Sequence, residues 1–328
     1  MEKVLIDRLR ATFDANFRLT RLYARLLEEC PDVITEEMIR AMTEDGDTTK
    51  EEAIVAILSE LFGLDWDNPK DRTLIRSYLI PSVRILDAKR YTENPYYKNI
   101  KISDIKDGDW ELRLESYKPY RAVIAGDMEI YDDFREVAPL GFFTEEFRFP
   151  AVLEGGNEWM TLTPVDLDTS DEAIEAAHGR VVTFGLGLGY YAYMCSEKEE
   201  VESITVIEKS PDVIKLFKTH ILPQFPNKDK VTVIEADAFE YAGKDMAAAK
   251  YDVAFVDTWR DASDGTPMYI KMKSFEYLSP NTKFLYWIEN FLISRKRSIL
   301  YSELMEMYDN GGAGGKLTYD TIARLLKR

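Results

Sequence analysis

The chain has 328 residues, 45% of them hydrophobic, and its 59 acidic against 42 basic residues give a formal net charge of −17. This length supports one large domain or several smaller ones, and the negative charge disfavours nucleic acid as a partner. Two cysteines and two histidines argue against a disulfide framework and a metal site. No apolar run reaches the roughly 20 residues of a membrane helix, and the N-terminus does not resemble a signal peptide. We therefore expect a cytoplasmic protein without a membrane partner.

Residues 1–98 are predicted to form a helical N-terminal domain. Apolar residues recur at helical intervals through the first 26 positions. Thr49 and Glu52 have the spacing of a capping box at the start of a second amphipathic stretch. A further helix should follow Pro69 and be kinked or ended by Pro81.

Residues 99–165 are predicted to form a β-rich connector. The stretch DWELRLESY at 109–117 alternates between apolar and polar residues, which is typical of a strand. The stretch FRFPAVLEGGNEWMTL at 147–162 indicates two strands joined at 155–157. Just before the connector, Tyr96 and Tyr97 in NPYYKN at 94–99 either cover a ligand pocket or form an exposed turn.

Residues 166–292 alternate between helical and strand patterns. The first helix is expected at 170–179, and strands are expected at 180–187, 203–208, 230–237, 251–257 and 283–289. Continuous apolar strands separated by helices predict a mainly parallel, doubly wound sheet with helices on both faces. Residues 293–328 should form a C-terminal helical tail with a loop at 310–315. The fold class is therefore α/β, with a Rossmann-like domain preceded by the helical domain and the connector.

Three glycines, Gly185, Gly187 and Gly189, follow the first of these strands, and Tyr190 begins the next helix. A glycine-rich turn lets the backbone approach a ligand closely, and the N–H groups of the following helix point toward it. We expect these residues to form part of a binding site for a ligand.

The next three strands end in acidic residues. Glu208 lies 23 positions beyond Gly185, where an acid accepts hydrogen bonds from both ribose hydroxyls. Asp237 is placed to accept a hydrogen bond from the adenine amine, and Ala238 to cover the adenine ring. Asp257 ends the fourth strand, beside the expected position of the ligand's reactive group. The four strand ends together predict an adenosine-containing ligand.

The series VVTFGLGLG, VTVIEKS, VIEADAFEY and YDVAFVD resembles the class I S-adenosylmethionine-dependent methyltransferases over 168–292. The resemblance implies S-adenosyl-L-methionine as cofactor, with the three glycines lining its methionine and ribose portions. It also implies Glu208 at the ribose and Asp237 at the adenine amine. Two features depart from the family pattern: Thr183 stands where an acid is frequent, and little chain follows Asn290 for a terminal antiparallel hairpin.

Three other functions compete with methyl transfer. A nicotinamide dehydrogenase fits Gly187, Gly189 and Ala192 as a G-x-G-x-x-A variant but leaves Asp237 without a role. An aminopropyltransferase of the spermidine-synthase kind fits the acid-rich stretch after the fourth strand, YDVAFVDTWRDASD. A non-enzymatic adenosyl-ligand-binding protein would share the same fold.

Methyl transfer from a sulfonium depends mainly on positioning, and a base is needed only for a protonated acceptor. Asp257 is the candidate catalytic residue, as that base or as a group that orients the acceptor. Trp259 is a candidate wall of the acceptor pocket. The acceptor is predicted to be a small molecule or a protein.

Overall fold

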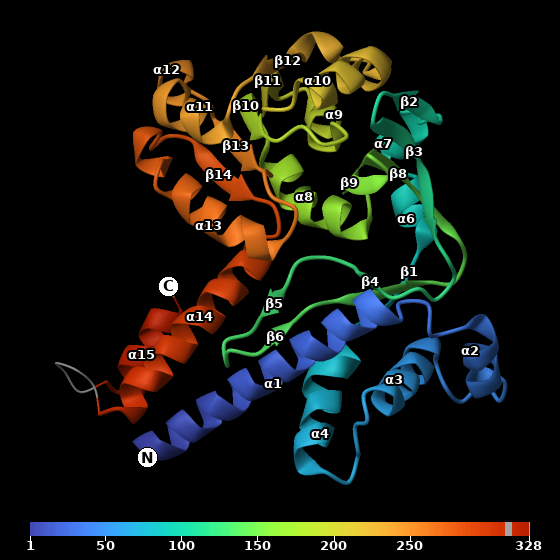
Figure 1. Cartoon of the computed structure of the whole chain (residues 1–328), viewed down its shortest axis with the longest axis vertical. Coiled ribbons are helices and arrows are strands. Elements are labelled where there is room, and N and C mark those ends of the chain that lie inside the picture. Colours follow the sequence, from blue (N-terminus) through green and yellow to red (C-terminus); the bar gives the residue numbers. More distant parts are fainter. Residues whose placement is uncertain (312–316, 328) are drawn as a thin grey trace. The chain divides into compact units, whose positions relative to one another are not determined.

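The computed structural model describes residues 1–311 and 317–327 (Figure 1). The chain divides into two compact units, one comprising 1–85, 120–144 and 290–328 and the other 86–119 and 145–289. These boundaries differ from the four consecutive segments expected from the sequence. Part of the predicted connector, 120–144, belongs to the first unit because its strands pair there. Most of the predicted loop at 310–315 lies outside the described residues.

The first unit is largely helical, as expected for its N-terminal part. Thr49 and Glu52 form the predicted capping box, and the helix after Pro69 continues through a π-helical segment and ends one residue beyond Pro81. The stacked rings of Phe13 and Tyr301, with centroids 3.9 Å apart, join the first helix to the C-terminal part of the chain. The helices are α1 (Glu2–Glu29), α2 (Glu36–Thr43), α3 (Lys50–Leu61), α4 (Pro69–Leu74), the π-helical Ile75–Leu79, α5 (Ile80–Ser82), α14 (Glu289–Asp309) and α15 (Tyr319–Leu326).

Short strands complete this unit. The strand β7 is central in a three-stranded sheet of order β1-β7-β4 and is buried along its whole length. This pairing ties residues 120–144 to the chain segment that follows Pro81. The strands are β1 (Val83–Leu86), β4 (Val123–Ile124), β5 (Glu129–Ile130), β6 (Glu136–Val137) and β7 (Leu140–Phe143).

The second unit begins with two short helices and an antiparallel sheet of order β2-β3-β8-β9. The strands predicted at 109–117 and 147–162 are confirmed, and the turn between β8 and β9 lies at 155–156. These elements are α6 (Ala88–Thr92), α7 (Pro95–Asn99), β2 (Ile105–Asp107), β3 (Trp110–Tyr117), β8 (Phe147–Glu154) and β9 (Asn157–Thr161).

The predicted parallel sheet is confirmed and has five strands in the order β12-β11-β10-β13-β14. This order matches the first five strands of the 3-2-1-4-5-6 arrangement of the Rossmann fold. Among the described residues, no strand of the antiparallel sheet pairs with an edge strand of this parallel sheet. The strands are β10 (Gly179–Phe184), β11 (Val201–Glu208), β12 (Val231–Glu235), β13 (Val253–Val256) and β14 (Lys283–Tyr286).

Helices cover both faces of this sheet. Figure 1 shows α8, α9 and α10 on one side and α11 and α13 on the other. The helix expected at 170–179 begins six residues earlier, at Pro164, because Thr163 and Asp166 form a capping box there. The helices are α8 (Pro164–Ala176), α9 (Tyr190–Ser196), α10 (Pro211–Leu216) with a π-helical turn at Phe217–Ile221, α11 (Ala238–Lys244), α12 (Met246–Ala249) and α13 (Ala262–Lys273), with 3₁₀ turns at Leu222–Gln224, Lys228–Lys230 and Glu276–Leu278.

None of the helices in the described part of the chain combines the length and the apolar composition needed to cross a membrane.

Candidate functional site

The glycine turn that follows β10 is shaped by close contacts with other parts of the protein. All three glycines have positive φ angles, +100° at Gly185, +51° at Gly187 and +74° at Gly189. A Cβ on Gly185 would overlap the backbone carbonyl oxygen of Asp257. A Cβ on Gly187 would overlap the Met160 side chain. The backbone conformation favours glycine at all three positions, and at Gly185 the fixed backbone oxygen of Asp257 also leaves no space for a side chain.

The helix α7 supports this turn from outside the parallel sheet. The Tyr96 hydroxyl is buried and donates a 2.6 Å hydrogen bond to the carbonyl oxygen of Leu188. The Asn94 amide donates to the Tyr190 hydroxyl at 3.0 Å. Of the two interpretations of NPYYKN, the exposed turn is therefore wrong, because the Tyr96 ring is fully buried and packs edge-on against the ring of Tyr190.

Glu208 lies at the carboxyl end of β11 and connects that strand to the glycine turn. Its Oε2 accepts a 3.2 Å hydrogen bond from the Leu186 N–H, and its Oε1 accepts from Lys209 and Ser210 N–H at 2.8 Å. The side chain is half-buried. The carboxylate therefore lies beside the glycine turn, at the strand end where a ribose is expected.

Asp237 follows β12 and caps the helix α11. Its Oδ1 accepts hydrogen bonds from the N–H groups of Phe239 at 2.9 Å and Glu240 at 3.0 Å. The residue is exposed, whereas Ala238, the first residue of α11, is buried. Capping of α11 is a sufficient structural reason for an aspartate at this position, whether or not a ligand binds. Its second carboxylate oxygen, Oδ2, has no hydrogen bond to the described residues.

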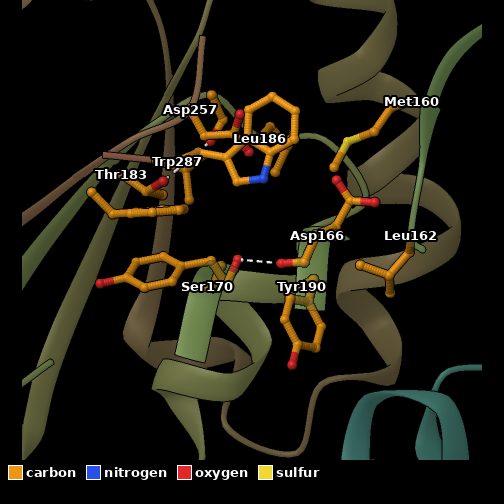
Figure 2. Close-up of a pocket in the computed structure, with 14 residues that line it drawn as sticks. Met160, Leu162, Asp166, Ser170, Thr183, Leu186, Tyr190, Asp257 and Trp287 are labelled. Carbon is orange, nitrogen blue, oxygen red and sulfur yellow. Dashed lines mark hydrogen bonds between the residues drawn. The ribbon is translucent and has the colours of Figure 1, made fainter. Parts of the chain in front are cut away.

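A cavity of about 20 Å³ opens at the carboxyl edge of the sheet, between the ends of β10 and β13 (Figure 2). The chain leaves β10 toward β11 on one side and reaches β13 on the other, so this is the point where the strand order reverses. Ligands of open α/β sheets bind outside the carboxyl ends of the strands at such points. Among the predicted site residues, Gly185, Tyr190 and Asp257 line the cavity.

Two carboxylates, those of Asp257 and Asp166, line this cavity. Burial, followed by the negative charges of Asp166 and Glu208, raises the pKa of Asp257 from 3.8 to about 8. None of the described residues donates a hydrogen bond to the Asp257 carboxylate. Burial also raises the pKa of Asp166 to about 6, although the N–H and hydroxyl of Thr163 each donate to it at 2.8 Å. The surroundings of both carboxyl groups therefore disfavour their ionised forms.

Trp287 closes the cavity from the end of β14. Its side chain is 9% exposed, and its Nε1 is buried without a hydrogen-bond partner among the described residues. Figure 2 shows the nitrogen edge of its indole ring facing the centre of the cavity. The next residue, Ile288, has a φ of +47°, which is a strained conformation for a β-branched side chain. The strained residue Ile288 therefore directly follows Trp287, whose indole N–H has no partner among the described residues.

Asp166, Trp287 and Met160 are among the residues of this cavity that the sequence prediction missed. A signal for Asp166 was present in the stretch TPVD at 163–166, which has capping-box spacing and proline at the first helical position. Trp259, predicted as a pocket wall, does not line the cavity; its ring stacks at 6.4 Å on that of Tyr286.

Among the described residues, no group of three or more His, Cys, Asp or Glu side chains is arranged to hold a metal ion.

Several solved structures are similar to part of this chain, at low sequence identity. No family model and no curated protein matches the chain. A precorrin 8w decarboxylase from Methanobacterium thermoautotrophicum is 19% identical, with 38% of this chain and 64% of that chain covered and a TM-score of 0.29. A protein from Klebsiella pneumoniae assigned as an O-methyltransferase is 15% identical, with 32% and 46% covered and a TM-score of 0.26. A spermidine synthase from Thermotoga maritima is 14% identical, with 52% and 68% covered and a TM-score of 0.32.

Proposed function

We propose that the chain is an S-adenosyl-L-methionine-dependent methyltransferase whose cofactor binds along the carboxyl edge of the parallel sheet. One observation carries the proposal: the glycine turn after β10 meets Asp257 at the point where the strand order reverses. Glu208 lies at the next strand end and is hydrogen-bonded to the same turn. This arrangement suits a ligand with a ribose at Glu208 and its reactive group near Asp257.

The site must open to admit such a ligand. Pockets for ligands of this size measure roughly 300 Å³ or more, whereas the cavity measures about 20 Å³. The Met160 side chain occupies the space directly next to Gly187 and also lines the cavity. The proposal therefore requires Met160 to move when the ligand binds, while the adenosine half lies outside the cavity, toward Glu208 and the exposed Asp237.

The chemistry needs little beyond correct placement. The sulfonium of the cofactor is already activated, so alignment of the acceptor supplies most of the rate. Asp257 accepts a proton from the acceptor or orients it. We propose a small molecule or a protein as acceptor, since the net charge of −17 opposes binding of nucleic acid, and we propose the cytoplasm as the location.

Aminopropyl transfer is the second candidate. The two carboxylates at Asp166 and Asp257 favour a cationic group in the cavity, and polyamine substrates carry such groups. A nicotinamide dehydrogenase is less well supported, because the described sheet has five strands and so contains no second complete mononucleotide-binding half.

Calorimetric titration tests the proposal. S-adenosylhomocysteine should bind with micromolar affinity, and at a hundredfold excess over its Kd it should add about 2.7 kcal/mol to the free energy of unfolding. Binding of NAD without binding of S-adenosylhomocysteine would contradict it. Product analysis then separates the two candidate reactions, since methyl transfer releases S-adenosylhomocysteine and aminopropyl transfer releases methylthioadenosine.

Asp257→Asn tests the proposed role of this carboxylate. The affinity for S-adenosylhomocysteine should change little, while turnover should fall about 10²-fold or more if the carboxylate acts as the base. A smaller fall indicates that the residue only orients the acceptor. A folded variant that no longer binds the cofactor would show that the reactive group lies elsewhere.

A further inference from the structure

We propose that the second unit carries a binding site for a primary alkylammonium group, which the side chain of Lys273 occupies in the structure. The residues around this side chain, which we call the amine cage, are Trp259, Tyr269, Glu276, Tyr286 and Glu289. None of them lines the cavity at the ends of β10 and β13. The amine cage is therefore a second site, and the inference does not depend on the proposed function.

The ammonium group of Lys273 lies between two carboxylates and two aromatic rings. Its Nζ is 3.2 Å from Oε1 of Glu276 and 3.2 Å from Oε1 of Glu289. It also lies 4.6 Å from the ring centroid of Tyr286 and 5.4 Å from that of Tyr269. A cation within about 6 Å of an aromatic face is attracted to it, and proteins use such faces to recognise organic ammonium ligands. The amine cage thus has the composition of an ammonium-binding site.

The walls of the amine cage are held by contacts that do not involve the lysine. The Tyr269 hydroxyl donates a 2.6 Å hydrogen bond to Glu289, and the Tyr286 hydroxyl donates a 2.8 Å hydrogen bond to Glu276. The two tyrosine rings pack edge to face at 4.9 Å, and the ring of Trp259 stacks on that of Tyr286 at 6.4 Å. Burial raises the pKa of both tyrosines, so both hydroxyls keep the protons that they donate. These contacts preorganise the site for a cation from another molecule.

The lysine is an exchangeable occupant. Its side chain is 38% exposed, and those of Glu276 and Glu289 are 35% and 33% exposed. Ion pairs with this exposure contribute little to stability, so Lys273 can turn into solvent at low cost. The wall itself contains an unsatisfied group, because Trp259 is 5% exposed and its Nε1 is buried without a hydrogen-bond partner among the described residues. Unpaired buried donors are rare in folded proteins, which favours a ligand site over a purely structural cluster.

Calorimetric titration of the full chain with butylammonium chloride tests the site, since this cation matches the end of a lysine side chain. Butylammonium should bind saturably, whereas butanol, which lacks the charge, should not. Lys273→Ala should strengthen butylammonium binding about tenfold or more, because it removes the competing ammonium group. Lys271→Ala is the matched control, since Lys271 is also an exposed lysine of α13 above an aromatic ring, that of Phe239 at 4.2 Å, but lies outside the amine cage. Its affinity for butylammonium should equal that of the original protein.

Glu289→Gln, added to Lys273→Ala, locates the bound cation. The amide oxygen still accepts from Tyr269, but the negative charge is lost, so butylammonium should bind about fivefold or more weakly than to Lys273→Ala alone. If Lys273→Ala does not bind butylammonium, Lys273 forms only a structural ion pair and the inference is wrong. Equal affinity for butanol would contradict it as well, because the site would then recognise only apolar surface.

Two further titrations complete the test. Nα-acetyl-lysine methylamide identifies the source of the ammonium group, since tighter binding than butylammonium indicates a lysine of a peptide or protein, and weaker binding indicates a free amine. S-adenosylhomocysteine should bind Lys273→Ala within about twofold of its affinity for the original protein. Loss of that binding in the folded variant would show that the amine cage is not a separate site. Failure of S-adenosylhomocysteine to bind the original protein would contradict the proposed function and leave the amine cage in place.

Discussion

Gly185 and Asp257 meet backbone to backbone, because the carbonyl oxygen of Asp257 occupies the space that a Cβ on residue 185 would fill. The contact joins the ends of β10 and β13, two parallel neighbours in the sheet. It places the turn that approaches the ligand and the candidate catalytic carboxylate within one rigid arrangement. The φ of +100° at Gly185 also favours glycine at this position, independently of the contact with Asp257.

Gly185→Ala should therefore lower the free energy of unfolding by about 2 kcal/mol or more, as strain and overlap add. Chemical denaturation measures the loss. Gly156→Ala is the matched control, because Gly156 has a φ of +81° but no neighbouring atom lies within 4 Å of the position that a Cβ would take there, so it reports the backbone strain alone. Equal losses in the two variants would show that the contact with Asp257 contributes nothing.

Glu208→Ala should weaken S-adenosylhomocysteine far more than Glu235→Ala does, by about tenfold or more. The two acids are register partners at the ends of β11 and β12, but only Glu208 is bonded to the glycine turn, through Leu186 N–H. Titration calorimetry of both variants decides the matter. Similar affinities would place the ribose elsewhere.

The raised pKa of Asp257, about 8 against 3.8, gives stability a defined pH dependence. Between these values the folded chain keeps a proton that the unfolded chain has lost, so the contribution of this group to stability falls as pH rises from about 4 to about 8. The charged groups that raise this pKa are Asp166 and Glu208. Asp257→Asn removes the charge, so the variant should gain stability relative to the original protein at pH 8 compared with pH 5.

Denaturant unfolding at both pH values measures this gain, with Glu202→Gln on the exposed face of β11 as the control. A stability difference between the Asn variant and the original protein that does not change with pH would mean that Asp257 is ionised in the folded state.

Met160→Ala should strengthen binding of S-adenosylhomocysteine by about threefold to tenfold, because the side chain no longer has to leave the space above Gly187. The stability of the variant should fall only modestly, since Met160 is partly exposed. Calorimetry gives the affinity. A weaker complex would show that the thioether contacts the ligand and does not obstruct it.

The parallel sheet was predictable because each strand is a short apolar run, and four of the five strands end at or next to a glycine or an acid. The glycine turn could be recognised for the same reason, although the sequence could not show that Gly185 accommodates Asp257 and Gly187 accommodates Met160. Those neighbours come from distant segments, and their contacts depend on tertiary packing. The same holds for Trp287, whose unpaired nitrogen is visible only once the ends of β10, β13 and β14 are brought together.

The domain organisation was harder to predict from sequence. The segment 120–144 has the same β-rich composition as its surroundings, but β7 pairs with β1, which follows the N-terminal helices. Strand partners are chosen by packing between distant segments and leave little local signal. Asp166 is a different case, since its capping box was visible in the stretch TPVD and the start of α8 could have been placed from it.

The position of S-adenosylhomocysteine in a structure of the complex is the decisive measurement. We expect the ligand along the carboxyl edge of the parallel sheet, with its ribose at Glu208 and its sulfur between Gly185 and Asp257, and with Met160 displaced from Gly187. A ligand bound at any other surface, or the absence of saturable binding to the folded protein, would show that this edge is not the cofactor site.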